Sequence, residues 1–334
     1  MILITGGTGL VGAHLLAHLV QTEQRIKAIY RTENKLDAVK NVFTYYFDDV
    51  DYFYDKIEWL QADVTDVPSL ETAFSKVTHV YHAAALISFD PKDFDMLRKV
   101  NIQGTANIVN LCVAHGVKKL CFVSSIAAVG ENEDPTIPIT EETHWNPEVD
   151  NSVYAISKYG SEMEVWRGSQ EGLDIVIVNP AIILGAGFWR TGSGSLFRKI
   201  DQGLKYYTKG ILSYVDVQDV VTVMIQLMES NIKNERFVLV AENWSLEKFT
   251  KTMAKALDVK PPTKEASSFL IGIGWRMDWL RQFFTGKHRK LTKQTAKSIQ
   301  SQSFFDSSKI QNALNFKFKP LEETIERVSK RYRK

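Results

Sequence analysis

Cysteine is scarce in this 334-residue chain, which contains only Cys112 and Cys121. Two cysteines cannot form a disulfide framework, so we expect a reducing, cytoplasmic environment. The apolar start of the chain is too short for a signal peptide, and no basic segment precedes it. No uninterrupted apolar run approaches ~20 residues, so no membrane-spanning helix is expected.

The chain also lacks a cluster of Cys and His residues, and no Ser/His/Asp arrangement stands out. His14 and His18 would share one helix face, but no third ligand is evident. We therefore expect ordinary packing or surface histidines and no metal site.

Charge of either sign is nearly balanced overall, at +2, but not along the chain. Residues 285–334 hold thirteen Lys or Arg and four Asp or Glu. A solvated helix face is the favoured interpretation, and a basic rim for an anionic substrate or a membrane surface is the alternative. Nucleic acid is a poor fit, because no binding motif accompanies the charge.

Glycine is concentrated where it is most informative, at the start of the chain. An apolar run, Met1–Ile4, leads into Gly6, Gly9 and Gly12, and an amphipathic segment, Leu10–Val20, follows. This layout of strand, tight loop and helix start places a pyrophosphate at a helix N-terminus. Gly6 permits the sharp turn, Gly9 permits close approach of the phosphate, and Gly12 permits close packing of helix on strand.

Apolar runs alternate with helical patterns through the first 180 residues, which predicts βαβ units and a doubly wound parallel α/β sheet. The predicted strands are Met1–Thr5, Arg25–Tyr30, Ile57–Gln61, His79–His82, Lys119–Ser124 and Asp174–Val178. The predicted helices include Leu10–Val20, Pro68–Ser75, Asp93–His115 and Val153–Gln170. We expect an NADP-binding Rossmann domain over 1–180 and a smaller, mostly helical substrate-binding region over 181–334. Within that region, a strand at 236–240 is expected to return to the main sheet, and a helix to follow at Ser245–Leu257.

Two segments depart from this alternation of strands and helices. Val42–Asp55 is aromatic and acidic, and we expect an elaborated connection that packs on the sheet edge. Phe269–Phe284 is rich in large apolar residues. It could be a core helix, a lid over an apolar substrate or a membrane-touching patch, with the core helix favoured.

The end of the second predicted strand bears on the choice of cofactor. A dinucleotide-binding fold usually places an acid there, which accepts hydrogen bonds from the adenosine ribose. Here Arg31 follows Tyr30, nineteen positions after Gly12. A guanidinium can pair with a 2′-phosphate, so NADP is preferred over NAD. Glu33 and Asn34 lie close enough to keep NAD open.

Tyr154 and Lys158 form a Tyr-x-x-x-Lys pair. On a helix, residues i and i+4 share a face, so the phenol and the ammonium can point into one cleft. A buried Lys⁺ is expected to lower the Tyr pKa and make the phenol usable as a proton donor or acceptor near neutral pH. Tyr52 and Lys56 have the same spacing but follow no strand that could bring a cofactor near.

A serine at the end of a strand completes the candidate constellation. The predicted strand that begins at Lys119 ends in Ser124 and Ser125, at the edge of a parallel sheet where ligands bind. A serine there can hydrogen-bond the oxygen of a carbonyl that is being reduced. A helix cap is the alternative role for a serine in this place.

In these motifs the chain resembles the extended short-chain dehydrogenase/reductases, which include sugar-nucleotide epimerases and dihydroflavonol-4-reductases. The matching pieces follow the family order and cover about residues 1–220. They are Thr5–Gly12, Asp63-Val64, Tyr81–Ala85, Asn101–Thr105, Ser124-Ser125, Tyr154 with Lys158, Asn179–Gly185 and Tyr214–Val220.

The resemblance implies roles for individual residues. Ser125, Tyr154 and Lys158 would be catalytic, with Ser125 chosen over Ser124 by its distance from Gly130. Asn101 would support the lysine through a helix distortion and a water molecule. The cofactor-binding set it implies is Thr5, Gly6, Gly9, Leu10, Val11, Gly12, Arg31, Asp63, Val64, Ala83, Ala84, Ala85, Ser124, Tyr154, Lys158, Asn179, Pro180 and Ile182. The family often dimerises through a four-helix interface, so a homodimer is an open expectation.

At several positions the sequence differs from the patterns of particular branches of this family, and these differences indicate which branch it is most similar to. Ile126 and Ala127 follow the serine where the 4,6-dehydratases carry acids, and Ala128-Val129-Gly130 stands where epimerases often carry Val-Tyr-Gly. These differences favour an NADPH-dependent reductase of an apolar or aromatic ketone or aldehyde, similar to the dihydroflavonol-reductase branch. A nucleotide-sugar epimerase or reductase, a membrane-associated enzyme similar to 3β-hydroxysteroid dehydrogenases, and a non-catalytic NADP-binding redox sensor are the alternatives.

Overall fold

The computed structural model describes residues 1–334 except 23–24, 133, 135, 287–288, 290 and 334. Its centre is a seven-stranded parallel sheet in the order β10-β6-β5-β4-β1-β2-β3. Its strands are β1 (Ile2–Thr5), β2 (Ile26–Tyr30), β3 (Ile57–Gln61), β4 (His79–His82), β5 (Lys119–Val123), β6 (Asp174–Pro180) and β10 (Glu235–Leu239). The predicted doubly wound parallel sheet is confirmed, and each predicted strand is present to within two residues.

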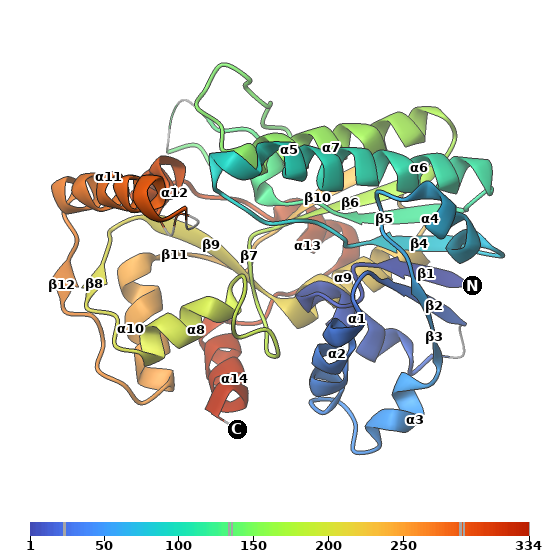
Figure 1. Ribbon diagram of the computed structural model, residues 1–334, viewed down its shortest axis with the longest axis horizontal. Helices are drawn as coiled ribbons and strands as arrows, with labels where there is room; N and C mark the ends of the chain where they lie inside the picture. Colours follow the sequence, from blue (N-terminus) through green and yellow to red (C-terminus); the bar gives the residue numbers. More distant parts are fainter. Residues whose placement is uncertain (23–24, 133, 135, 287–288, 290, 334) are drawn as a thin grey trace.

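Helices cover both faces of this sheet (Figure 1). One face carries α4 (Val67–Phe74), α5 (Phe94–Leu97), α6 (Gly104–Ala114) and α7 (Val153–Gln170). The other carries α1 (Leu10–Leu19), α2 (Leu36–Phe43), α3 (Val50–Tyr54) and α9 (Val217–Glu229). Two buried apolar clusters, one on each face, fill the space between sheet and helices. Such coverage explains why β1, β2 and β5 are buried along nearly their whole length instead of alternating between buried and exposed residues.

The helix predicted over Asp93–His115 is not continuous. A π-helical turn, Arg98–Gln103, separates α5 from α6. Short 3₁₀ turns lie at η1 (Glu33–Lys35), η2 (Pro91–Asp93) and η4 (Ile126–Ala128). Single π turns inside helices are frequent at functional sites, and this one contains Asn101.

The aromatic segment 42–55 lies beside the edge strand β3, as expected. Its residues form the end of α2 and the whole of α3, and Tyr54 stacks on Trp59 of β3 with ring centroids 5.4 Å apart. Aromatic side chains of this segment therefore pack against the edge strand of the sheet.

The rest of the chain forms small sheets and helices beside the carboxyl ends of the strands (Figure 1). The strands are β7 (Ile182–Leu184), β8 (Tyr206–Tyr207), β9 (Ile211–Asp216), β11 (Glu242–Ser245) and β12 (Lys264–Glu265). The helices are α8 (Gly194–Asp201), α10 (Leu246–Ala256), α11 (Ser268–Thr285), α12 (Lys293–Ser298), α13 (Ser308–Leu314) and α14 (Leu321–Arg333). A third apolar cluster, which includes Phe197, Tyr214, Phe249 and Ile325, holds α8, α10 and α14 together.

The prediction that Phe269–Phe284 is a core helix is wrong. The segment forms α11, but most of its large apolar side chains are exposed, and among its apolar residues only Ile271 is buried. The apolar count of a segment cannot reveal which way each side chain faces. Among the described residues, no helix is long and apolar enough to cross a bilayer.

Candidate functional site

The glycine loop runs from the carboxyl end of β1 into α1. Gly6 has φ +73°, and a Cβ there would lie 2.5 Å from the backbone of Ala83 and Ala84 beyond β4. A Cβ at Gly12 would lie 2.2 Å from the Gly6 carbonyl oxygen. The close contact expected at Gly12 is therefore with the loop itself and not with the strand. Gly9 is the N-cap of α1, and no side chain in the described chain caps that helix end, which leaves its N–H groups available to an anion.

Thr5 and His82 tie this loop to the neighbouring strand. The hydroxyl of buried Thr5 lies 2.6 Å from Nδ1 of His82 and accepts a hydrogen bond from the Ala84 N–H at 3.3 Å. Nε2 of His82 contacts Thr105 at 2.9 Å, and burial lowers the histidine pKa to about 3. The side chain of Thr5 is thus used within the protein, and it positions the ends of β1 and β4 rather than pointing into the site.

The two serines at the end of β5 face different partners. Ser124 is buried and donates to Oε2 of Glu162 at 2.7 Å. The Ser125 hydroxyl lies beside the phenol of Tyr154 and accepts from the Ala127 N–H at 3.1 Å, which caps the η4 turn. The structure places Ser125 beside Tyr154 and Ser124 in the protein interior. Ser125 therefore caps the η4 turn and contacts Tyr154 at the same time.

The expected lowering of the Tyr154 pKa is wrong for this structure. Burial raises the pKa of Tyr154 to about 12, and the neighbouring Ser125 hydroxyl offsets only part of that effect. The reason is the direction of the lysine. The Lys158 ammonium donates to the Val123 carbonyl at 2.9 Å and lies 4.6 Å from the ring centroid of Phe122. Desolvation of the phenol therefore outweighs the attraction between phenolate and ammonium.

Lys158 is one of the most buried cations in the molecule, with 2% of its surface exposed. Burial lowers its pKa to about 8, while the carboxylate of Glu162 acts in the opposite direction. Tyr154, Lys158 and Glu162 are spaced by four residues on α7, so all three lie along one face of that helix. The shared face brings the predicted pair to the carboxyl end of β5.

Asn101 sits in the π turn and is buried. Its side chain accepts from the Leu86 N–H at 2.7 Å, donates to the Leu86 carbonyl at 2.9 Å and donates to Ser157 Oγ at 3.0 Å. The helix distortion at Asn101 is present. Its direct partners are the loop after β4 and α7 instead of Lys158, so its contacts are those of a positioning residue.

Glu162 is a residue of this site that the sequence reasoning missed. Its carboxylate is fully buried and accepts hydrogen bonds from Ser124, from Asn179 at 2.8 Å and from Arg236 at 3.1 Å. It therefore joins α7 to β5, β6 and β10. The spacing Tyr154, Lys158, Glu162 was the available signal, because the third member of an i, i+4, i+8 series must share the face of the first two.

The far end of the candidate site lies where β2 and β3 end. Arg31 is exposed, and its guanidinium lies 3.9 Å from the carboxylate of Asp63. Asp63 also accepts from the N–H and hydroxyl of Thr65, both at 2.9 Å. Val64 is buried against Gly104 of α6. The predicted adenosine-side residues are therefore gathered together.

Asn179, Pro180 and Ile182 follow one another at the end of β6 and the start of β7. The Asn179 amide donates to the Ser125 carbonyl at 3.0 Å, and its Oδ1 is buried with no partner among the described residues. Ala83 and Ala84 lie across from them at the end of β4, half-buried, and Ala85 is exposed. The carboxyl ends of β1, β4, β5 and β6 thus meet around one region, where ligands bind in open parallel sheets.

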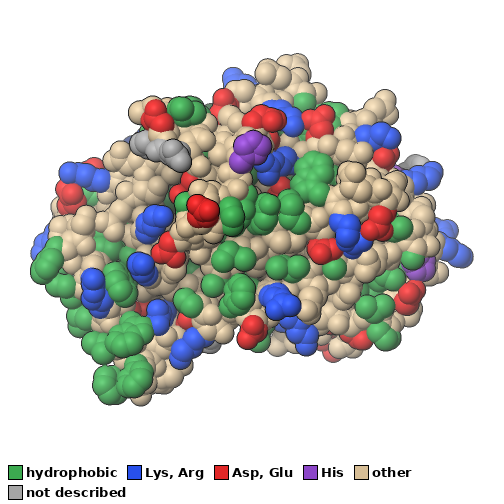
Figure 2. Space-filling view, turned by 90° about the horizontal axis from the view of Figure 1, so that it is seen from above, with side chains coloured by type: hydrophobic (Ala, Val, Ile, Leu, Met, Phe, Trp, Pro, Cys, Tyr) green, Lys and Arg blue, Asp and Glu red, His purple; other side chains and the backbone are tan. Residues whose placement is uncertain are grey.

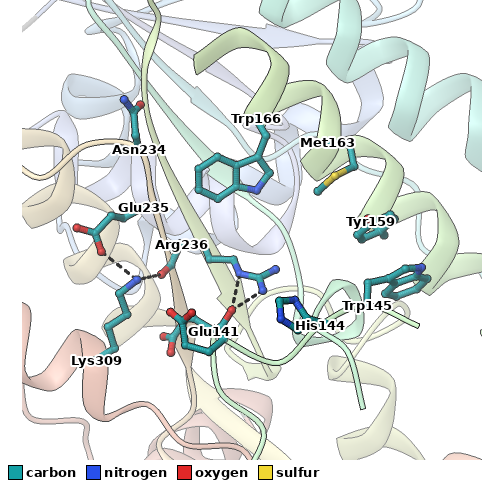
Figure 3. Close-up of a pocket in the computed structure, with 11 residues that line it drawn as sticks. Glu141, His144, Trp145, Tyr159, Met163, Trp166, Asn234, Glu235, Arg236 and Lys309 are labelled. Atoms are coloured by element: carbon teal, nitrogen blue, oxygen red, sulfur yellow. Dashed lines mark hydrogen bonds and ion pairs between the residues drawn. The ribbon is translucent and has the colours of Figure 1, made fainter. Parts of the chain in front are cut away.

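A hollow lies outside this region, on the flank of α7 and β10 (Figure 3). It has a volume of about 450 Å³ and is lined by Trp145, Tyr159, Trp166, Arg236 and Lys309 among others. Its two cations are already engaged: Arg236 with Glu162 and the Glu141 carbonyl, and Lys309 with Glu235 at 2.9 Å. No predicted catalytic or cofactor residue is among the residues that line it.

The remaining candidates from the sequence lie elsewhere. His14 is buried and contacts Tyr46 at 2.5 Å and the Ala186 carbonyl at 3.0 Å, and burial lowers its pKa to about 4. Lys56 lies over the ring of Tyr52 on the surface. Among the described residues, no group of three or more His, Cys, Asp or Glu side chains is arranged to hold a metal ion. Of the basic residues in 285–334, Lys287, Lys290 and Lys334 lie outside the described residues.

Comparison with known proteins agrees with this geometry. The model of the NAD dependent epimerase/dehydratase family matches residues 2–240. A putative dihydroflavonol 4-reductase from Synechocystis sp. is 29% identical over 73% of this chain and 68% of its own length. Sterol demethylase protein B from Methylococcus capsulatus is 26% identical over 93% of this chain and 92% of its own.

A solved structure extends the similarity to the whole fold. The crystal structure of gox2253 superposes with a TM-score of 0.81 at 25% identity and covers 100% of this chain and 98% of its own. The strand order, the glycine loop and the C-terminal elements are therefore a shared architecture and not a peculiarity of this sequence.

Proposed function

Because the chain belongs to the NAD dependent epimerase/dehydratase family, and is thus a nicotinamide-dependent enzyme acting on hydroxyl or carbonyl groups, we propose that it is an NADPH-dependent reductase of an apolar ketone or aldehyde. The observation that carries the proposal is the contact between Ser125 and Tyr154 at the end of β5, with Lys158 on the same face of α7. We further propose that residues 1–180 hold the cofactor and that residues 181–334 supply the substrate side.

The residues present fit a dinucleotide. The uncapped start of α1 offers N–H groups to a pyrophosphate, and open space lies beside Gly9, where a Cβ would meet only the Gly6 carbonyl at 3.3 Å. The unpartnered Oδ1 of Asn179 offers an acceptor at the end of β6. Arg31 carries an exposed guanidinium where a 2′-phosphate would lie, which is our reason for preferring NADPH.

When bound, the nicotinamide supplies the hydride for the reduction. The protein's own side chains act on the substrate oxygen. Ser125 donates a hydrogen bond to the substrate oxygen, and the phenol of Tyr154 gives that oxygen its proton. A pKa of about 12 keeps the phenol protonated at neutral pH, which suits a proton donor. The ammonium of Lys158 donates to the Val123 carbonyl in this structure and would have to turn toward Tyr154 to stabilise the phenolate that forms, because opposite charges attract strongly in a buried site.

The side chains around Tyr154 favour an apolar substrate. The ring of Phe89 lies 5.3 Å from that of Tyr154, and Ile87 on the same loop is also exposed. The residues after Ser125 are Ile126 and Ala127, so the acids used for elimination of water by 4,6-dehydratases are absent from those positions. Similarity to a dihydroflavonol reductase and to a protein of sterol metabolism supports the same substrate class.

A substrate panel tests the proposal. NADPH oxidation is followed with aromatic, terpenoid and steroid ketones, with aldehydes, and with UDP- and GDP-sugars. Epimerisation of the sugar nucleotides, which consumes no NADPH overall, is followed by chromatography of the products. We expect turnover of apolar carbonyl compounds and none of the sugar nucleotides. Turnover of a sugar nucleotide alone would establish the second candidate, a nucleotide-sugar epimerase or reductase, which the family match favours equally.

The variant Tyr154→Phe separates chemistry from binding. We expect at least ~10²-fold loss of kcat, because proton transfer by a positioned side chain contributes that much, while NADPH binding persists in a fluorescence titration. Binding with no turnover of any carbonyl by the wild-type protein would instead support a redox sensor. Near wild-type turnover by Tyr154→Phe would remove the mechanism.

A further inference from the structure

The outer surface of α11 is unusually apolar. Phe269, Ile273, Met277, Leu280 and Phe284 recur at intervals of three and four residues and are all exposed, so they form one continuous stripe along the helix. Phe269, Phe283 and Phe284 have 76%, 72% and 78% of their surface exposed. Hydrophobic side chains gather on the end of the molecule where α11 lies (Figure 2).

Two polar side chains of the same helix, Asp278 and Gln282, face the protein. Gln282 has only 3% of its surface exposed and donates to Oδ2 of Asp90 at 2.7 Å. Asp278 accepts from the Leu291 N–H at 2.9 Å, and Arg289 donates to Oε1 of Gln282 at 2.8 Å. An ordinary surface helix turns its apolar face inward. Hydrogen bonds hold α11 in the opposite orientation, so its apolar face is available to a partner.

The surroundings of this face are positively charged. Residues 264–297 contain eight Lys or Arg and two Asp or Glu. Both acids have ion-pair partners: Glu265 with Lys209 at 3.0 Å, and Asp278 with Arg281 at 2.7 Å. Exposed cations on α11 and on α12, which packs against it, therefore dominate the charge; they include Arg276 and Lys297, whereas Lys293 is paired with Asp150 at 3.3 Å.

The helix also borders the candidate active site. Asp90, which accepts the hydrogen bond from Gln282, is the neighbour of Phe89, and Phe89 contacts Tyr154. Exposed apolar side chains of this loop and of α5 extend the apolar surface beyond α11; they are Ile87, Phe89, Phe94 and Met96. The loop that contacts Tyr154 thus packs against the inner face of α11.

We propose that α11 is an interfacial helix, which docks the enzyme on the surface of an anionic phospholipid bilayer. An exposed apolar stripe with basic flanks is the combination that lies in a headgroup region, since the apolar side chains enter the acyl boundary and the cations attract anionic lipid. In that orientation the loop with Phe89 lies directly behind the docked helix, because Asp90 bonds to the inner face of α11. An apolar carbonyl compound dissolved in lipid then reaches Tyr154 without crossing water, a consequence that rests on the proposed function, whereas docking itself does not.

Vesicle co-sedimentation tests the proposal with the full chain. The wild-type protein is mixed with phosphatidylcholine vesicles, and in parallel with phosphatidylcholine–phosphatidylglycerol vesicles. We expect binding to the anionic vesicles that weakens at about 1 M salt, where the Debye length is only about 3 Å. No binding to the anionic vesicles overturns the proposal.

Two variants and two matched controls separate the contributions. The triple variant Phe269→Ser/Phe283→Ser/Phe284→Ser should lose more than about tenfold in partitioning, because three large apolar side chains no longer enter lipid. Arg276→Glu/Lys297→Glu should lose preference for anionic vesicles. The controls Tyr52→Ser and Lys118→Glu alter an exposed aromatic and an exposed cation away from α11 and should bind like the wild type.

Each result of the vesicle assays leads to a different conclusion. Unchanged binding by the triple variant, with a wild-type thermal unfolding curve, overturns the assignment to α11. Concentration-dependent self-association that the triple variant abolishes, together with no vesicle binding, assigns the face to a second copy of this chain instead. Because the assay contains neither cofactor nor carbonyl compound, its failure leaves the proposed reaction untouched, and failure of the substrate panel leaves docking untouched.

Discussion

Lys158 is a candidate catalytic residue whose buried charge lowers the stability of the folded protein. Its ammonium is buried beside Phe122, and burial lowers its pKa to about 8 from an ordinary 10.5. The folded protein therefore binds the proton more weakly than the unfolded chain does. The contribution of Lys158 to stability rises as the pH increases from about 8 to 10.5, and below pH 8 the full cost of the buried charge is present.

The variant Lys158→Met tests this linkage. We expect it to raise the free energy of unfolding at pH 7 by about 1–3 kcal/mol, since replacing a buried ion by an apolar group of similar size is often stabilising, and Glu162 keeps Arg236 as its ion-pair partner. The gain should shrink between pH 8 and pH 10.5. Urea unfolding at pH 7 and pH 10 measures both values, and a gain that does not change with pH would contradict the assignment.

Arg31 makes a prediction about the cofactor. Replacement by Asp places a carboxylate where a 2′-phosphate would lie and next to Asp63. We expect Arg31→Asp to shift the ratio of NADPH to NADH affinity toward NADH by about tenfold or more, because a hydrogen bond to a charged group is worth ~1.5–3 kcal/mol. Fluorescence titration of both cofactors measures the ratio. Arg25→Asp, at the opposite end of β2, is the control and should leave the ratio unchanged.

At the scale of elements, Glu162 is the main polar link within the sheet. Its carboxylate accepts hydrogen bonds from Ser124 after β5, Asn179 on β6 and Arg236 on β10. One side chain thus connects α7 to three strands. Because Arg236 is largely buried, removal of the carboxylate leaves an uncompensated cation. The arrangement of the catalytic face of α7 depends on this anchor.

We expect Glu162→Ala to destabilise the protein by about 3–5 kcal/mol, the usual cost of breaking a buried ion pair. The double variant Glu162→Ala/Arg236→Met should recover part of the loss, since no buried charge is then left unpaired. Urea unfolding of the wild type, the two single variants and the double variant gives the coupling energy. Additive losses would show that the two side chains do not act as a pair.

Elements also mark the limit of the sequence patterns. Periodicity predicted one helix over Asp93–His115, but the π turn at Arg98–Gln103 shifts the register within it. That turn directs Asn101 toward Leu86 and Ser157. An average over a helical window cannot detect a single inserted turn, because the residues on either side keep the same period.

For the molecule as a whole, Asp216 and Asp219 join the last helix to the rest. Asp216 accepts hydrogen bonds from Thr324 at 2.9 Å and from Arg327, and Asp219 accepts from the N–H and the ammonium of Lys319, both at 2.8 Å. Both aspartates are buried at the junction of β9 and α9. The C-terminal segment is thereby fixed to an element that packs on the main sheet.

The variant Asp216→Ala should lower the free energy of unfolding by about 2–3 kcal/mol, less than for a fully buried pair because Arg327 is one-third exposed. Circular dichroism and tryptophan fluorescence should report one common unfolding transition in the wild type. The control Glu322→Ala removes an exposed carboxylate from α14 and should change stability by less than about 0.5 kcal/mol. Separate transitions in the wild type would contradict the single cooperative unit.

The sequence by itself determined the parallel sheet, the glycine loop and the residues gathered around it. Apolar runs, glycine spacing and the i, i+4 rule are local properties, and the register of a parallel sheet then brings Gly6, Ser125 and Tyr154 to one edge.

The orientation of side chains was decided only by tertiary structure. The Lys158 ammonium turns to the Val123 carbonyl, so desolvation raises the Tyr154 pKa instead of lowering it. The polar residues of α11 bond to Asp90 and to the backbone near Leu291, so its apolar residues face outward. Both outcomes depend on partners distant in the chain, which no local pattern contains.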